Sequence, residues 1–287
     1  MANLKEIRNR ITSIGSTMQI TSAMKMVSAA KLKKAQDAIT AMRPYSSKLT
    51  ELLQNLSATL DDDAGGSFST ERDVKKVLLV AITSNRGLCG GFNSSITKQV
   101  TKTVAEKYAN VTVDLLTIGK KGNDSLSKQF TVIDNKNDIY DDLTFDNVSK
   151  IAEKLMDLYI DGSYDKIEVV YNQFKNAATQ IPQVEQFLPI KPIEGGEAIT
   201  NSDYIFEPSK EEIILALIPK SLKTQLYKSI RDSFASEHGA RMTAMHKATD
   251  NATDLRDELL LTYNKARQAA ITNEILEIVG GAEALNN

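Results

Sequence analysis

Apolar residues recur every three or four positions at both ends of the chain, and they do so over unusually long stretches. Residues 3–57 contain one proline and one glycine, and residues 220–279 contain one glycine and no proline. Helices of these lengths would extend roughly 80 Å and roughly 90 Å at the usual helical rise. Because such helices cannot be buried in a compact core, the pattern predicts that they pack on each other and reach a partner.

Near the N-terminus the apolar positions follow the spacing of a coiled-coil seam. The seam positions are Leu4, Ile7, Ile11, Ile14 and Met18. The same register then meets three polar residues, Thr21, Lys25 and Ser28, before it recovers at Leu32. We expect a second stripe, made of Ile20, Met24 and Val27, to take over the packing there. Pro44 predicts a kink or an end of this helix.

The C-terminal helix carries small residues at its inward-spaced positions. The expected seam is Met245, Ala248, Ala252, Leu255, Leu259, Thr262, Ala266 and Ala269. Small side chains let two helix axes come close, so the two terminal helices are predicted to form a slim antiparallel coiled coil. Ser209 with Glu212 predicts the start of a helical region, Pro219 suits the first turn of its long continuation, and Gly280 with Gly281 predicts its end.

Between the helices the pattern changes to short apolar runs that alternate with helical segments. Strands are expected at 77–82, 111–118, 167–174 and 183–189, and helices at 93–108 and 146–160. This alternation predicts a parallel or mostly parallel sheet covered by helices. We therefore expect a Rossmann-like α/β domain at 74–207. It would follow an N-terminal coiled-coil helix at 1–60 and a polar linker at 61–73, and precede a C-terminal coiled-coil helix at 208–287.

Composition is that of an ordinary water-soluble protein, but the charge is unevenly distributed. The net charge is −2, and no apolar run approaches the roughly 18 residues that span a bilayer. Residues 1–48 carry nine basic and two acidic residues, whereas residues 250–285 carry three basic and seven acidic ones. Two helices of opposite sign would attract each other if antiparallel, and the basic helix would also suit an acidic partner. A solvated charged face is the plainer interpretation.

The sequence offers few candidates for catalytic or ligand-binding residues. Residues 84–93 (SNRGLCGGFN) lie between a strand and a helix, where an α/β fold would hold a phosphate. They match neither glycine-rich nucleotide motif, so a tight turn of small residues is favoured. Cys89 is the one cysteine, which excludes an internal disulfide, and no histidine is near it in sequence. Asp250, Asp254 and Glu258 share a helix face and are interpreted as a solvated ion-pair face.

Several motifs, in matching order and spacing, resemble one known family over nearly the whole chain. They lie at residues 20–31, 43–45, 84–93, 235–245, 249–252, 263–274, 277–279 and 281–282. The family is the gamma subunit of F-type ATP synthases. Several motifs on one architecture are more specific than a single glycine-rich loop.

The resemblance implies a rotor shaft without catalytic residues, metal or cofactor. The coiled coil would run through the axis of a hexameric head of alpha and beta subunits. The α/β domain would sit at the foot, against the epsilon subunit and the membrane ring of c subunits. The membrane would be met only through that ring, and no nucleic acid is implied. The absence of a leader sequence leads us to expect the cytoplasmic face of a bacterial inner membrane.

The resemblance also assigns partner contacts to individual residues. Contacts with the catalytic subunits are expected from four polar residues, Arg267, Gln268, Thr272 and Glu274. Acidic loops of the same subunits are expected to face Met24 and Lys25, and an apolar bearing is expected around Leu276 and Val279.

The chain departs from the family pattern at two glycines, and other functions are weighed beside the shaft. Gly239 stands where alanine is usual, which should cost about 1 kcal/mol of helix stability, and Gly15 is likewise a soft point. One alternative is a coiled-coil scaffold with a non-catalytic α/β domain, and another is an enzyme with a site in that domain. A nucleic-acid binder is disfavoured because the basic helix lacks interleaved aromatic residues.

Overall fold

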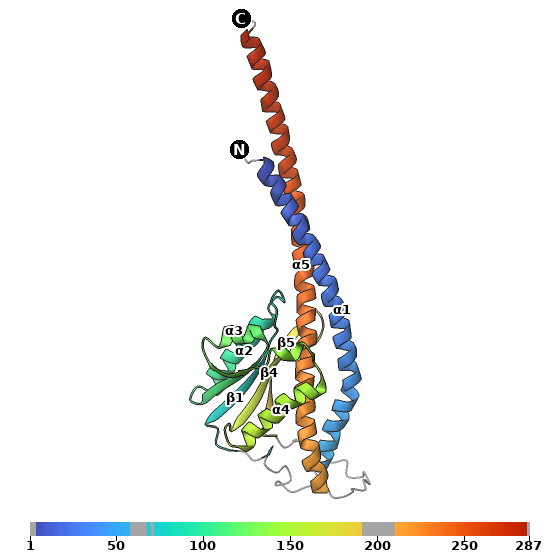
Figure 1. The fold of residues 1–287 in the computed structure, drawn as a ribbon, viewed down its shortest axis with the longest axis vertical. Helices are drawn as coiled ribbons and strands as arrows, with labels where there is room; N and C mark the ends of the chain where they lie inside the picture. The colour runs from blue at the N-terminus through green and yellow to red at the C-terminus, as the bar shows by residue number, and fades with distance from the viewer. Residues whose placement is uncertain (1–3, 58–67, 70–71, 191–209, 286–287) are drawn as a thin grey trace. The chain divides into compact units, whose positions relative to one another are not determined.

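The computed structural model describes residues 4–57, 68–69, 72–190 and 210–285 of the 287-residue chain. The chain divides into two compact units. One comprises Met1–Ser28 with Met242–Asn287, and the other comprises Ala29–Arg241. Two long helices, α1 (Leu4–Ser57) and α5 (Lys210–Leu285), each contribute a stretch to both units (Figure 1).

The second unit contains a five-stranded sheet in the order β3-β2-β1-β4-β5. Its strands are β1 (Lys76–Ile82), β2 (Thr112–Ile118), β3 (Thr131–Asn135), β4 (Lys166–Phe174) and β5 (Gln180–Leu188). The first four are parallel, and β5 runs antiparallel to β4. The expected mostly parallel sheet is therefore confirmed, and the strand expected at 183–189 is β5.

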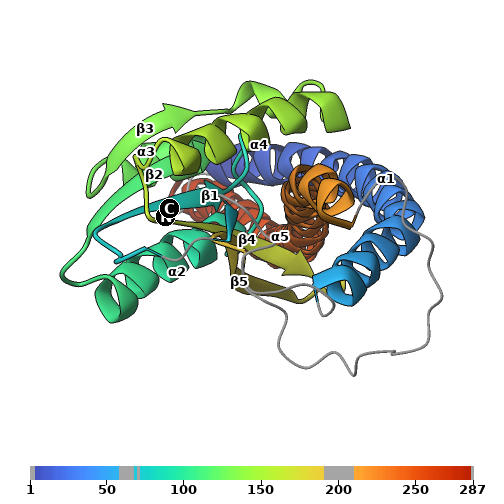
Figure 2. The same ribbon diagram turned by 90° about the horizontal axis from the view of Figure 1, so that it is seen from below.

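Helices cover both faces of this sheet. They are α2 (Phe92–Lys107), α3 (Lys120–Leu126) and α4 (Phe145–Ile160), with the short 3₁₀ helix η2 (Asp138–Tyr140) before α4. Leu78, Val80 and Ile82 of β1 pack toward α4 and α5, whereas Val77 and Leu79 pack toward α2 and α3. Seen from below, α2 and α4 lie on opposite sides of the sheet (Figure 2). Burial on both faces explains why β1 is a continuous apolar run.

Two elements of the α/β domain, α3 and β3, are missing from the sequence-based expectation. The α3 sequence, KKGNDSL, is polar and contains a glycine, so it has little helical periodicity. The β3 sequence, TVIDN, is a short edge strand with only two apolar residues. The expected linker at 61–73 lies largely outside the described residues.

Both long helices continue past the residues that were expected to interrupt them. α1 includes Pro44 and runs on to Ser57, so an end at Pro44 is wrong. Pro44 and Thr40, whose carbonyl loses its helical partner there, are both exposed, so water can satisfy that carbonyl. α5 begins nine residues before Pro219, so placing this proline in the first turn is wrong. It also passes through Gly280 and Gly281 to Leu285, so the expected end there is wrong too.

Candidate functional site

In the first unit, α1 and α5 form an antiparallel pair that three side-chain contacts define. The Thr21 and Thr249 hydroxyls lie 2.8 Å apart, the Thr253 hydroxyl donates to the Met18 sulfur at 3.3 Å, and Lys25 Nζ is 3.4 Å from His246 Nδ1. As the α1 number rises, the α5 number falls. The predicted antiparallel coiled coil is therefore confirmed within this unit.

The α1 side of the pair keeps the predicted register through its polar stretch. Ile7, Thr21 and Ser28 are all buried, while Ile20 is 61% exposed and Val27 is 57% exposed. The expectation that the second stripe takes over the packing is thus wrong. Two hydroxyls can fill a seam without an unpaired donor, because one can donate to the other while the second donates to a backbone carbonyl of its own helix. Ile20 and Val27 of the second stripe face outward, and Met24 is half-buried.

The α5 side of the pair differs from the predicted seam at alternate positions. Leu255 is 47% exposed, and Thr262 and Ala269 are exposed. Ala248, a predicted seam residue, and Thr253 are half-buried beside the seam. The inward seam positions are Met245, Thr249, Ala252, Arg256, Leu259, Tyr263 and Ala266. These follow a regular alternation of four and three residues, as a heptad seam requires. Apolar character alone favoured Leu255, whereas the structure turns Arg256 inward, where its guanidinium Nη1 donates to the Met18 sulfur at 3.9 Å.

From Arg267 to Glu283, every residue of α5 is exposed. Extending the α1–α5 pairing at equal rise brings Leu4 level with about residue 267, so the rest of α5 has no α1 residue beside it among those described. Five large apolar side chains in this segment are between 48% and 66% exposed: Ile271, Ile275, Leu276, Ile278 and Val279. An apolar helix end of this size without a neighbour marks an interaction surface.

The turn at 84–91 is stiff and internally bonded. Asn93 accepts from the Ser84 amide at 3.0 Å and donates to the Cys89 sulfur at 3.2 Å, and Leu88 has a positive φ of 60°. Burial raises the pKa of the Cys89 thiol, so it is neutral at physiological pH and a poor nucleophile. The interpretation of these residues as a structural turn is therefore favoured over a reactive site.

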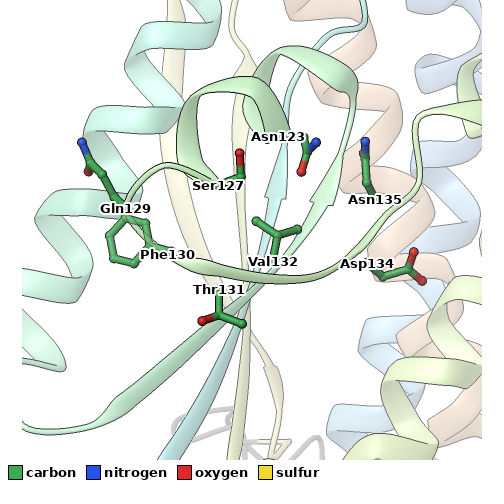
Figure 3. A pocket seen from close by; sticks show the side chains of 8 residues that line it. All are labelled: Asn123, Ser127, Gln129, Phe130, Thr131, Val132, Asp134 and Asn135. Carbon is green, nitrogen blue, oxygen red and sulfur yellow. The ribbon is translucent and has the colours of Figure 1, made fainter.

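A shallow hollow of about 640 Å³ lies beside the edge strand β3 (Figure 3). Its lining residues are Asn123, Ser127, Gln129, Phe130, Thr131, Val132, Asp134 and Asn135. The one ionisable member, Asp134, is engaged by Lys154 at 2.6 Å and Lys136 at 3.1 Å. Burial raises its pKa, but the bonds from these lysines outweigh burial and hold the pKa below its usual value. The carboxylate of the hollow is therefore engaged in ion pairs with two lysines.

Comparison with known proteins decides the family. A family model described as ATP synthase matches residues 3–285. The ATP synthase gamma chain of Flavobacterium psychrophilum is 76% identical over 285 residues, covering 99% of each chain. The chain belongs to the ATP synthase gamma chain family. The gamma chain of Flavobacterium johnsoniae is 73% identical and covers all of both chains.

Solved structures agree with the gamma chain fold. A central-stalk chain of the Tetrahymena thermophila mitochondrial ATP synthase is 27% identical with a TM-score of 0.60, covering 80% of this chain and 99% of that one. A rotor chain of the Euglena gracilis mitochondrial ATP synthase has a TM-score of 0.69 over 93% of this chain and 98% of that one. At 22% identity the second likeness shows the fold alone.

In this gamma chain the predicted contact residues fall into two groups. Six lie on the exposed end of α5: Arg267, Gln268, Thr272, Glu274, Leu276 and Val279. Met24 and Lys25 are half-buried on α1, level with His246, so the two groups are roughly 30 Å apart along the helix. Their roles as contacts remain predictions.

Sequence reasoning missed other members of both surfaces. On the α5 end these are Ile271 and Ile275, which share a stripe with Ile278 at helical spacing. On α1, Met26 is 66% exposed beside Val27. The spacing was visible in the sequence, but an apolar stripe reads the same whether a neighbour in the chain or a partner covers it.

Proposed function

We propose that this gamma chain is the rotating shaft of an ATP synthase and that it carries no catalytic residue. It would transmit rotation between the ring of c subunits and the head of alpha and beta subunits, where ATP is made or hydrolysed. Family membership supports this role.

The main support for this role comes from the exposed apolar side chains at the end of α5. Full burial of a Leu, Ile or Val side chain stabilises by about 1.5–3 kcal/mol, and five such side chains in this segment lie largely in water. Because an unaccompanied helix is only marginally stable in water, the segment needs an enclosing partner. We propose that Leu276 and Val279 lie in an apolar bearing of the head.

Polar residues would supply the contacts that change as the shaft turns. Arg267, Gln268, Thr272 and Glu274 present donors, acceptors and both signs of charge on an exposed helix. We propose that they contact the catalytic subunits, and that Met24 and Lys25 meet acidic loops of the same subunits. Each copy of a catalytic site would face a different side of the helix, so its conformations would be biased by a different contact free energy. Exposed ion pairs are weak enough to break at each step.

We further propose that the α/β domain, spanning 74–207, contacts the epsilon subunit and the ring of c subunits. Among the described residues no helix carries an apolar stretch long enough to cross a bilayer. The chain would therefore be a peripheral subunit that meets the membrane through the ring. The bacterial relatives support a place on the cytoplasmic face of the inner membrane.

The test is ATP hydrolysis by purified alpha and beta subunits, measured with and without this chain. A stable complex with strongly raised, multi-site turnover is expected. An unchanged rate and no complex would favour the alternative, a coiled-coil scaffold with a non-catalytic α/β domain.

The contact assignment has its own variant. Replacing Arg267 and Gln268 together by alanine should lower turnover or assembly, because the pair lies on the exposed helix end. The matched control replaces Lys98 and Gln99, a similar dipeptide on α2 of the α/β domain. Equal activity of both double variants would refute the assignment of Arg267 and Gln268.

A further inference from the structure

The carboxyl ends of β1 and β4 hold a segment of α5. The strand order reverses between these two strands, and in doubly wound folds a ligand binds in the crevice at such a switch point. Here the Ser236 hydroxyl donates to the Asn172 carbonyl of β4 at 3.0 Å. Arg241 donates to the Arg86 carbonyl at 3.0 Å, in the turn that follows β1. The α5 helix thus contacts both sides of the crevice, β4 on one side and the turn after β1 on the other.

The crevice is built around this helix. Asn172 is fully buried and donates to the Phe92 carbonyl at 3.0 Å, which ties β4 to the start of α2. Cys89 and Phe92 pack with Ala240 of α5 in one buried cluster. On the other side, a Cβ at Gly239 would stand 3.1 Å from Ala177 Cα in the β4–β5 turn. The α5 helix therefore packs closely against the turn after β1 on one side and against the β4–β5 turn on the other.

A buried ion pair also helps to hold α5 in the crevice. The Arg241 and Glu237 side chains are each 9% exposed and form an ion pair of 2.6 Å. The Nη2 atom of the guanidinium donates to the Arg86 carbonyl at 3.0 Å, and the Nε atom donates to the Gly87 carbonyl at 3.3 Å. Burying an ion pair is costly unless its hydrogen-bonding capacity is used, and here the surplus donors of Arg241 are used by the turn. The contact is therefore bidentate between a planar fork and two carbonyls, which fixes orientation as well as distance.

We propose that this crevice is a torque clamp: the switch point holds α5 in place of a ligand, so that a force on the α/β domain turns the helix. The α5 helix is continuous beyond Arg241 into the first unit, so a rotation imposed at the clamp is carried along it. The inference rests on the proposed function, because a clamp of this kind matters only in a chain that transmits rotation.

The test compares Arg241→Gln with Arg241→Lys and Ser236→Ala in the full chain and the assembled enzyme. The control is Lys223→Gln, which removes another ionic contact of α5 with the α/β domain, the 2.6 Å pair with Glu153, away from the crevice. Arg241→Lys keeps the charge without the fork, and Ser236→Ala removes a single hydroxyl, so these two keep the test valid if Arg241→Gln does not fold.

Two readouts are needed. Hydrogen exchange at the Ser84 and Phe92 amides, which are bonded within the turn, should rise roughly tenfold or more in Arg241→Gln. Gradient-driven ATP synthesis should fall severalfold, while hydrolysis by the detached head stays within about twofold, because the detached head does not load the α/β domain. Arg241→Lys and Ser236→Ala should fall between Arg241→Gln and the control.

The outcomes separate the two hypotheses. If the unmodified chain does not raise head turnover, the proposed function fails. If it does, but all three variants synthesise ATP as well as the Lys223→Gln control, the clamp alone is refuted. Faster exchange with unchanged synthesis also refutes it, because the contact would then be merely structural.

Discussion

Replacing Gly239 by alanine tests whether this glycine is a weak point of the helix or a requirement of its packing. Alanine in a helix interior is favoured over glycine by about 1 kcal/mol, so the sequence alone predicts a gain. In the structure the new Cβ would stand 3.1 Å from Ala177 Cα and 3.4 Å from its carbonyl oxygen. Optimal carbon–carbon contact is about 3.5–4.0 Å, so the β4–β5 turn would have to move by several tenths of an ångström.

That turn is braced against movement. The Asn176 side-chain oxygen accepts from the Ala178 and Thr179 amides at 3.0 and 2.7 Å, and Gln180 donates to the Ala177 carbonyl at 3.1 Å. Overpacking of this kind typically costs about 1–3 kcal/mol. Set against the helix propensity, the expected net effect of Gly239→Ala is a loss of about 0–2 kcal/mol.

Gly15 supplies the matched control, because a Cβ there would meet nothing within 4 Å. Gly15→Ala should therefore raise the unfolding free energy by about 1 kcal/mol. Both variants are measured in the full chain by denaturant unfolding followed by circular dichroism. The decisive quantity is the difference between them, expected to be about 1–3 kcal/mol. Equal gains would refute the argument, since the β4–β5 turn would then impose no constraint on α5.

Two further predictions concern buried polar groups. Burial, together with the positive charges of Arg241 and Lys31, lowers the pKa of His238 from 6.5 to about 3. Because the unfolded chain then binds a proton at a higher pH than the folded one, the stability that neutral His238 contributes is complete above pH 6.5 and is lost as the pH falls toward 3. The pH dependence of unfolding should therefore be shallower in His238→Asn, by up to about 1.4 kcal/mol per pH unit in that window, and equal slopes would contradict the assignment. In the helix pair, Thr21→Val and Thr249→Val should each cost about 0.5–1.5 kcal/mol and together little more than one alone. A double-mutant cycle with strictly additive losses would show that the 2.8 Å contact contributes nothing.

The fold was largely predictable because its main elements have strong periodicity. Burial on both faces makes β1 a continuous apolar run, and the amphipathic stripe of Val148, Ile151 and Leu155 identifies α4. The long helices were equally clear. Their ends were not, because Pro44 and Gly280 are tolerated at exposed positions where no packing enforces a break.

The candidate site was predictable only in part, for a physical reason. The apolar residues of the α5 end have the same spacing as a core stripe, and Leu255 looks like a better seam residue than Arg256. Which of them faces the partner helix depends on the register that α1 and α5 adopt, and Thr21 with Thr249 contributes to that choice. An argument built on hydrophobicity does not detect a pair of hydroxyls. The sequence therefore predicted a seam that is shifted by one residue at some turns, as at Leu255 instead of Arg256.

The same feature explains how the helix pair keeps apolar surface for a partner. A seam of Leu and Ile throughout would draw the largest side chains inward and leave a polar exterior. Here hydroxyls and small residues fill the seam at Thr21, Thr249 and Ala252, and Ile20 and Val27 remain outside. The pair is consequently held by modest contacts of its own and gains further stability where a partner covers the outer stripe. A helix pair built in this way keeps part of its apolar surface, including Ile20 and Val27, outside the seam.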